Sequence, residues 1–344
     1  MPTSRLPQPG AEPIEIQVTR GDIVECRHRV ACAVVDATGH RLAAWGDVAA
    51  PVYPRSANKA IQALPLIESG AAGAFGLGDV ELALACASHS GEPEHVAAVR
   101  AWLKKIGLGE GDLECGSQWP LHEASMHAMV ARGERPGALH NNCSGKHSGM
   151  LTTARHLREP TRGYVARDHA VQRRVIQALG EMAGLDLEKA PVGIDGCGIP
   201  TVALPLSNLA LAMARFAEPA ALPPARASAC RRLAAAMRRQ PLMIAGHGRL
   251  DSALIEASQG RILSKGGAEG VQVAMLPGRG IGIAIKALDG ATRAREVALG
   301  AVLDWLGVAD DALRTKLAGF FAPTITSRRG LTVGKVVTAA EAGF

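Results

Sequence analysis

The sequence predicts an α/β fold of the α+β kind, in which one antiparallel sheet is built from both ends of the chain. Strand-like alternation of apolar residues occurs towards both termini, whereas the middle of the chain has helical periodicity. We therefore expect a flexible N-terminus over 1–10 and a sheet subdomain formed by 11–55 and 242–344. A mainly helical subdomain over 56–241 is inserted between the two halves of the sheet.

The first predicted elements are strands rich in β-branched residues. IEIQVTR at 14–20 is one strand, and the segment 22–47 contains two more that are joined by the turn sequence DATG. These three strands form the N-terminal part of the predicted sheet.

The pattern becomes helical just after Arg55. The segment SANKAIQALPLIESGAA begins with Ser56, a good helix N-cap, and contains Pro65, which is expected to kink or end the first helix. Further helical stretches, separated by loops with glycine and proline, are predicted near 79–88, 93–107, 121–132, 145–157, 166–183, 202–216 and 225–239.

Strand patterns return from about residue 242. The predicted strands are SALIEAS at 252–258, GRILSKGG at 260–267, GVQVAMLPG at 270–278 and GIGIAIKALDG at 280–290. The last two strands are joined by the turn sequence PGRG, and helices are expected over 291–305 and near 310–319.

Composition excludes several classes of function. The 344 residues are 47% apolar, enough for a substantial core, and the net charge of +6 comes mostly from scattered arginines. With only 3% aromatic residues, nucleic-acid binding is not expected. The N-terminus lacks the apolar run of a signal peptide, and an uninterrupted 18-residue apolar stretch is absent, so we expect a cytoplasmic protein with no membrane contact. Seven cysteines favour free thiols or metal ligands over a disulfide framework.

Lysine is scarce in this chain, and its placement is informative. Only nine of the 38 basic residues are lysines, and Lys59, Lys146 and Lys265 stand among small residues in RSANK, NNCSGKHSG and SKGG. A desolvated lysine can lose its proton and act as a base or ligand, whereas arginine stays protonated. These positions therefore indicate lysine chemistry.

Two of these lysines lie close to a serine. Ser56 and Lys59 form an S-x-x-K element whose side chains would be neighbours on one helix face, so that the amine can activate the hydroxyl. An N-cap followed by a surface lysine explains the same spacing. Ser264 and Lys265 precede two glycines that would let a substrate approach a cation, although an exposed turn is the simpler interpretation. ASHSG, which contains Ser88, offers hydroxyl groups at a helix end.

Two glycine-bearing loops carry polar and thiol groups. NNCSGKHSG includes Cys143 but lacks the first glycine of a Walker motif, because His140 stands there, and nucleotide binding is rejected. GIDGCGIP places Asp195 and Cys197 among glycines. From the residues alone, the two thiols are either metal ligands or packed core groups.

Five strings in this order resemble one family. YPRSANKAIQALPLIESGA, LACASHSGE, HNNCSGKHSGML, GIDGCGIPT and LSKGGAEGV are similar to the class 3, thermolabile type of bacterial L-asparaginase, also called the asparaginase II family, over roughly 14–340. This resemblance implies a serine β-lactamase-like architecture, a homodimer and L-asparagine as substrate.

The resemblance also implies roles for individual residues. Two serine–lysine pairs, Ser56 with Lys59 and Ser88 with Lys265, would form the catalytic site, with Ser56 as nucleophile. Zinc would be held by three ligands, and three further residues would line the substrate pocket. The expected zinc ligands are Cys143, Lys146 and Cys197, and the expected substrate-binding residues are Arg55, His147 and Asp195. Asn58 is a departure, since the family often has a bulkier residue there.

The leading hypothesis is hydrolysis of L-asparagine to L-aspartate and ammonia through an acyl-enzyme. A glutaminase or another small-amide hydrolase would need only a different pocket depth. A non-catalytic sensor of an amino acid or zinc is the alternative from another class, and retention of Ser56 and Lys59 argues against it. An enzyme that reacts with penicillin is disfavoured because such proteins work outside the cytoplasm.

Overall fold

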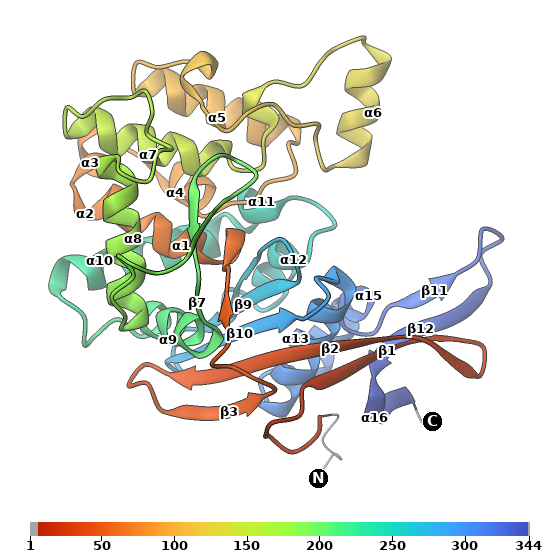
Figure 1. The fold of residues 1–344 in the computed structure, drawn as a ribbon. Coiled ribbons are helices and arrows are strands. Elements are labelled where there is room, and N and C mark those ends of the chain that lie inside the picture. The colour runs from red at the N-terminus through yellow and green to blue at the C-terminus, as the bar shows by residue number, and fades with distance from the viewer. Residues whose placement is uncertain (1–5, 343–344) are drawn as a thin grey trace.

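The computed structural model describes residues 6–342. Figure 1 shows a group of helices from the middle of the chain on one side of a sheet whose strands come from the two ends of the chain. This arrangement confirms the predicted fold class, an antiparallel sheet built from both termini with helices around it.

The main sheet has eight strands and is antiparallel at every pairing. Its order is β11-β12-β1-β2-β10-β9-β8, with β3 beside β2. The strands are β1 (Ile14–Arg20), β2 (Ile23–Asp36), β3 (Arg41–Trp45), β8 (Leu263–Gly266), β9 (Val271–Leu276), β10 (Ile281–Ala287), β11 (Thr324–Thr326) and β12 (Thr332–Thr338). The two termini meet where β1 pairs with β12, with Ile16 opposite Thr338.

Both faces of the sheet are covered, and the residues of β2 show why. Ala31, Ala33 and Val35 point into the core beneath the helical part, whereas Val30, Cys32 and Val34 point into a second core. This is the period of two expected of a strand with two buried faces. Helix α9 (Leu206–Ala217) packs on the first face, and α13 (Thr292–Trp305) packs against the second core.

The helical part lies between β3 and β8 in the chain. Its remaining helices are α1 (Lys59–Gln62), α2 (Leu64–Glu68), α3 (Ala71–Ala74), α4 (Asp79–Ala85), α5 (Pro93–Lys105), α6 (Glu123–Ala131), α7 (Ser144–His156), α8 (Ala170–Ala183), α10 (Pro224–Arg239), α11 (Pro241–Ala245) and α12 (Leu250–Ala257). Two small two-stranded sheets also occur there: β4 (Pro51–Val52) with β7 (Leu204–Pro205), and β5 (Val192–Ile194) with β6 (Pro200–Val202). The C-terminal region adds α14 (Asp311–Lys316), α15 (Ala318–Phe321) and α16 (Ala339–Ala342).

Some local predictions were wrong. SALIEAS forms most of helix α12 instead of a strand, because Leu250, Leu254 and Ser258 are buried at a spacing of four residues. The predicted helix over 202–216 begins only at Leu206, after β7. The hairpin of β11 and β12 was not anticipated, and in Figure 1 it extends away from the helices.

The first described residues include part of the segment that was expected to be flexible. Of the expected flexible segment 1–10, residues 1–5 lie outside the described residues, whereas Gly10 donates its N–H to the carbonyl of Ala44 at 2.8 Å. Within 6–342, no helix is both long and apolar enough to cross a membrane.

Candidate active site

Ser56 lies in a tight turn that a glycine-bearing strand approaches closely. A 3₁₀ turn over Arg55–Asn58 leads into α1, and Pro54 rather than Ser56 precedes its first residue, so the predicted capping role of Ser56 was wrong. Arg55 has a φ of 51°, which is unusual for a residue with a side chain. A Cβ atom on Gly267 would lie 2.8 Å from the carbonyl oxygen of Pro54, so glycine is required there for β8 to reach the serine turn.

Lys59 is fully buried and joins three segments of the chain. Its Nζ donates to the carbonyl of Ala87 at 2.5 Å, to Ser88 Oγ at 2.9 Å and to the carbonyl of Asn142 at 3.3 Å. Burial lowers the pKa of Lys59 below its ordinary value, because the charged form loses its hydration. The lysine of the S-x-x-K element therefore contacts Ser88, and among the bonds of the described residues none joins it to Ser56.

Lys265 is held in a second buried polar network. Its Nζ donates to the carbonyl of Gly266 at 2.6 Å and lies 3.6 Å from Asp251 Oδ2. Burial lowers the pKa of Lys265 to about 7, although Asp251 raises it. Asp251 stays ionised, with a pKa of about 2: burial opposes its charge, but Lys265 and the N–H of Gly266 at 2.8 Å outweigh that effect. The expected contact of Lys265 with Ser88 is not among the hydrogen bonds within 6–342.

Both candidate serines line one cavity of about 330 Å³ between the helical part and the edge strand β8. Sixteen residues form its wall: Arg55, Ser56, Ser88, Gln118, Asn141, Asn142, Cys143, Asp195, Gly196, Cys197, Arg249, Gly266, Gly267, Ala268, Thr292 and Arg295. A larger pocket of about 750 Å³ lies along α8 and the following loop, but it contains none of the serine or lysine groups discussed above. The smaller cavity is therefore the candidate active site.

Of the three residues expected to bind substrate, Arg55 and Asp195 line the cavity wall. Arg55 Nε donates to Asp195 Oδ1 at 2.9 Å, and its Nη2 lies 2.8 Å from the same oxygen. His147 is buried on α7, where its Nδ1 lies 2.7 Å from the hydroxyl of Tyr164, and it does not appear on the wall of this cavity. Arg55 and Asp195 thus face the cavity as a pair, while His147 lies away from the cavity wall and contacts Tyr164.

The three expected metal ligands converge beside the cavity. Lys146 Nζ lies 3.1 Å from Cys197 Sγ, and all three side chains are buried. A hydrogen bond with Cys197 lowers the pKa of Cys143 well below its ordinary value, against the effect of burial. Burial alone would lower the pKa of Lys146, but Cys143, Cys197 and Asp195 raise it. The residues therefore present two soft sulfur donors and one amine at a single point, which suits a zinc ion.

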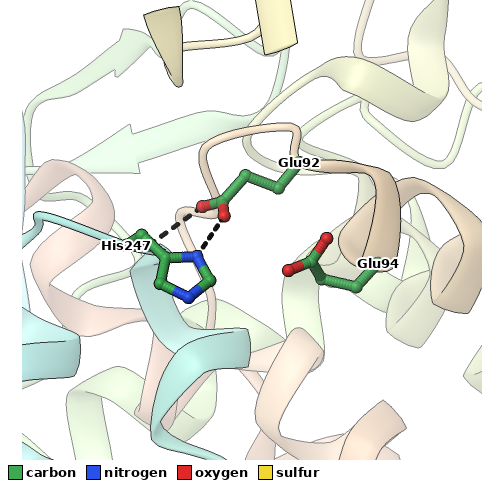
Figure 2. Close-up of side chains that lie close together, drawn as sticks. All are labelled: Glu92, Glu94 and His247. Atoms are coloured by element: carbon green, nitrogen blue, oxygen red, sulfur yellow. Dashed lines mark hydrogen bonds and ion pairs between the residues drawn. The ribbon is translucent and has the colours of Figure 1, made fainter. Parts of the chain in front are cut away.

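A buried carboxylate, missed by sequence reasoning, holds a loop at the cavity rim. Glu92 Oε1 accepts from Ser90 Oγ at 2.6 Å and from the N–H of His247 at 2.9 Å, and its second oxygen pairs with the ring of His247. Figure 2 shows the two contacts between Glu92 and His247, with Glu94 nearby. Because both oxygens of Glu92 are already engaged, we interpret this cluster as a clamp that fastens the segment before α12 to the Ser88 loop.

Asp251 and Arg249 were also missed. Both stand at the start of α12, which was predicted as a strand, so their positions relative to Lys265 and the cavity could not be foreseen. Asp251 accepts from Ser264 Oγ and Gln272 Nε2, each at 2.8 Å, in addition to its contacts with the Lys265 segment. An acidic residue in the first turn of an amphipathic helix was the available signal.

The sequence model of the L-asparaginase II family matches residues 16–338. No curated protein matches the sequence. Among solved structures, Mglu in its tris and glutamate form is 14% identical, with a TM-score of 0.47 over 81% of this chain and 59% of that chain. The D-alanine carboxypeptidase AmpC from Burkholderia cenocepacia is 14% identical, with a TM-score of 0.42 over 81% of this chain and 93% of the other. A simvastatin synthase mutant from Aspergillus terreus is 11% identical, with a TM-score of 0.39 over 75% and 86%. The chain spans less than two thirds of the length of the Mglu chain in that structure.

Proposed function

Because the chain belongs to the L-asparaginase II family, we propose that it hydrolyses the side-chain amide of L-asparagine through a serine acyl-enzyme. Membership in this family supports amide hydrolysis, and L-asparagine as substrate and Ser56 as nucleophile are the finer parts of the proposal. The observation that carries it is the placement of Ser56 and Ser88 on the wall of one cavity, with the Nζ of buried Lys59 2.9 Å from Ser88 Oγ.

Ser56 is the proposed nucleophile. Its side chain is half-buried on the cavity wall, and within 6–342 its hydroxyl makes no hydrogen bond, so it is free to attack. Ser88 is 7% exposed, and its oxygen already accepts from Lys59. This contact leaves the Ser88 hydroxyl proton free to turn towards the cavity, as a relay between Ser56 and Lys59 requires.

The proposed reaction has two stages. Ser56 Oγ attacks the side-chain carbonyl carbon, and its proton passes to neutral Lys59 through Ser88. The C–N bond then breaks, ammonia leaves with the proton returned by Lys59, and a β-aspartyl ester remains on Ser56. Water cleaves this ester by the reverse proton path and releases L-aspartate. Burial supports this role, because it lowers the pKa of Lys59 and increases the neutral fraction.

Lys265 and the substrate-binding pair act around this centre. Lys265 is a residue of β8, the edge strand that leads to Gly267 beside the serine turn, and its amine donates to the carbonyl of Gly266 at 2.6 Å. Asp195 Oδ1 is engaged by Arg55, whereas its Oδ2 makes no hydrogen bond within the described chain. We assign that oxygen to the α-ammonium group of the substrate.

Zinc is the cofactor that we propose, held by Cys143, Lys146 and Cys197. The donor set fits, because two thiols and an amine are buried together and three protein ligands leave one position open. When bound, zinc would supply a fixed positive charge that orients the amino-acid end of the substrate. Lys146 must be neutral to act as a ligand, so metal binding has to displace its proton.

Ammonia release by the purified protein tests the proposal. We expect turnover of L-asparagine, slower turnover of L-glutamine and of amides without an amino-acid group, and no turnover by Ser56→Ala. Ser207→Ala, at the start of α9, is the matched control and should retain full activity. Faster turnover of glutamine would make the protein a glutaminase, and binding of asparagine without ammonia release would indicate the non-catalytic alternative.

A further inference from the structure

The cavity wall carries an excess of positive charge, and one of its cations has no hydrogen-bond or ion-pair partner within residues 6–342. Four charged side chains line the wall, of which three are arginines and one is Asp195. Arg55 pairs with Asp195. Arg295 donates to the carbonyls of Gly267 and Val271, the latter at 2.7 Å. The side chain of Arg249, by contrast, makes no hydrogen bond or ion pair with any residue of the described chain.

The backbone around Arg249 is held firmly. The clamp formed by Glu92 fixes His247, and Ser252 Oγ accepts from the N–H groups of Ala245 at 3.2 Å and Gly246 at 3.0 Å. A side chain at Gly246 would collide with Ser90 and Glu92, because a Cβ atom there would lie 2.0 Å from Ser90 Oγ. The guanidinium of Arg249 is thus carried at the cavity rim by a positioned loop, not by a loose surface segment.

Within 6–342, none of the nearby acidic groups forms an ion pair with Arg249. Glu296, which is close enough to interact with Arg249, lies 4.0 Å from Arg295. Asp251, two residues further on, is engaged by Ser264, Gln272 and the N–H of Gly266. Asp195 is engaged by Arg55. An unpaired, half-buried arginine in a cavity of about 330 Å³ favours an anionic ligand, and the planar guanidinium matches a carboxylate with two parallel hydrogen bonds.

We infer that Arg249 binds the α-carboxylate of the substrate and so restricts the enzyme to free amino-acid amides. This inference rests on the proposed amide hydrolysis at the same cavity. Arg249 would then bind the α-carboxylate and Asp195 the α-ammonium group, while Ser56 and Ser88 face the side-chain amide. A substrate whose α-carboxylate is replaced by a neutral group loses this contact and leaves the cation unpaired.

Binding to a protein that cannot turn over separates this inference from the proposed reaction. L-asparagine and L-asparaginamide, which has a neutral carboxamide in place of the α-carboxylate, are titrated calorimetrically into Ser56→Ala and into Ser56→Ala with Arg249→Gln. We expect the second change to weaken asparagine binding by about 10- to 100-fold, the range for a lost charge-assisted hydrogen bond, and to leave asparaginamide binding within about threefold. Arg249→Lys should lose most of the same affinity, because a lysine cannot form the paired contact.

Arg239→Gln is the matched control, since this exposed arginine at the end of α10 pairs with Asp79, lies outside the cavity wall and should change neither affinity. Equal losses for the two ligands, no loss for asparagine, or no binding of asparagine to Ser56→Ala at all would each overturn the inference. Ammonia release by the wild-type protein is measured separately, so that failure of the reaction and failure of the binding role give different results.

Discussion

Burying a lysine is unfavourable for its charged form, and Lys265 shows the consequence. It is 1% exposed, and the carboxylate of Asp251 lies 3.6 Å from the amine as a counter-charge. Lys59, Arg249 and Arg295 add repulsion from the facing elements. The pKa of Lys265 falls to about 7 from an ordinary value of 10.5, so the folded protein releases a proton that the unfolded chain retains between these values.

This difference predicts how stability depends on pH. Between about pH 7 and 9 the unfolded chain binds one proton more than the folded protein at Lys265, so the free energy of unfolding should rise with pH by up to about 1.4 kcal/mol per pH unit. Below pH 7, Lys265 is protonated in both the folded and the unfolded state, so its contribution to the free energy of unfolding no longer changes with pH. Asp251 stays ionised throughout this range and adds no slope.

Urea denaturation of the wild type and of Lys265→Met between pH 6 and 9 measures this effect. The variant should have a shallower dependence on pH, while Lys104→Met, which changes an exposed lysine on α5, should keep the wild-type dependence. Parallel curves for wild type and Lys265→Met would mean that Lys265 keeps its ordinary pKa in the folded protein.

At the scale of elements, the site is assembled where short segments approach each other closely. Gly145, near the start of α7, lies against α4, and a Cβ atom there would be 2.4 Å from the carbonyl oxygen of Leu84. This approach brings Cys143 and Lys146 beside the loop that carries Ser88. Cys197 arrives from the turn between β5 and β6, which is 51 residues from Lys146 in sequence.

The convergence of α7 and this turn predicts a metal content that can be measured. Purified protein should contain close to one zinc per chain, and Cys197→Ala should lose it, because two remaining ligands hold zinc poorly. Cys230→Ala, which removes a buried thiol on α10, is the matched control and should retain the metal.

Chelation should raise KM for asparagine more than it lowers kcat, since the proposed ion orients the substrate while serine supplies the nucleophile. If the native protein contains no zinc, Cys143 and Cys197 are packed core thiols and not metal ligands. Loss of turnover at saturating substrate after chelation would place the ion in the chemical step.

How far the sequence predicts these elements depends on how local the signal is. The turns DATG and PGRG lie between strands that pair with each other, so β2 with β3 and β9 with β10 could be predicted. The amphipathic spacing of α12 was read as a strand, because its apolar residues also alternate over a short window. That error hid Arg249 and Asp251.

The candidate site was predicted in its residues more than in its contacts. The spacing of Ser56 and Lys59 suggests a pair, yet Lys59 reaches Ser88 because α1 packs beside the loop after α4. Such a contact depends on tertiary packing and leaves no trace in residue spacing. The Glu92 clamp escaped prediction for the same reason, since His247 is 155 residues away.

At the scale of the whole molecule, the main sheet joins strands from the two ends of the chain. β12 pairs with β1, and β10 pairs with β2, so residues near the two termini share one core, which includes Ile16, Ile283 and Val336. The helical part stands on the other face of this sheet, as Figure 1 shows. The cavity lies where loops of the helical part meet the edge strand β8.

Trapping the acyl group tests the central claim most directly. The protein is mixed with L-asparagine, quenched in acid within the first turnovers, digested and analysed by mass spectrometry. The account predicts a β-aspartyl group on the peptide that contains Ser56, its absence in Ser56→Ala, and its slower formation on the same peptide in Ser88→Ala. An acyl group on Ser88, or ammonia release with no acyl group on any serine, would contradict the account.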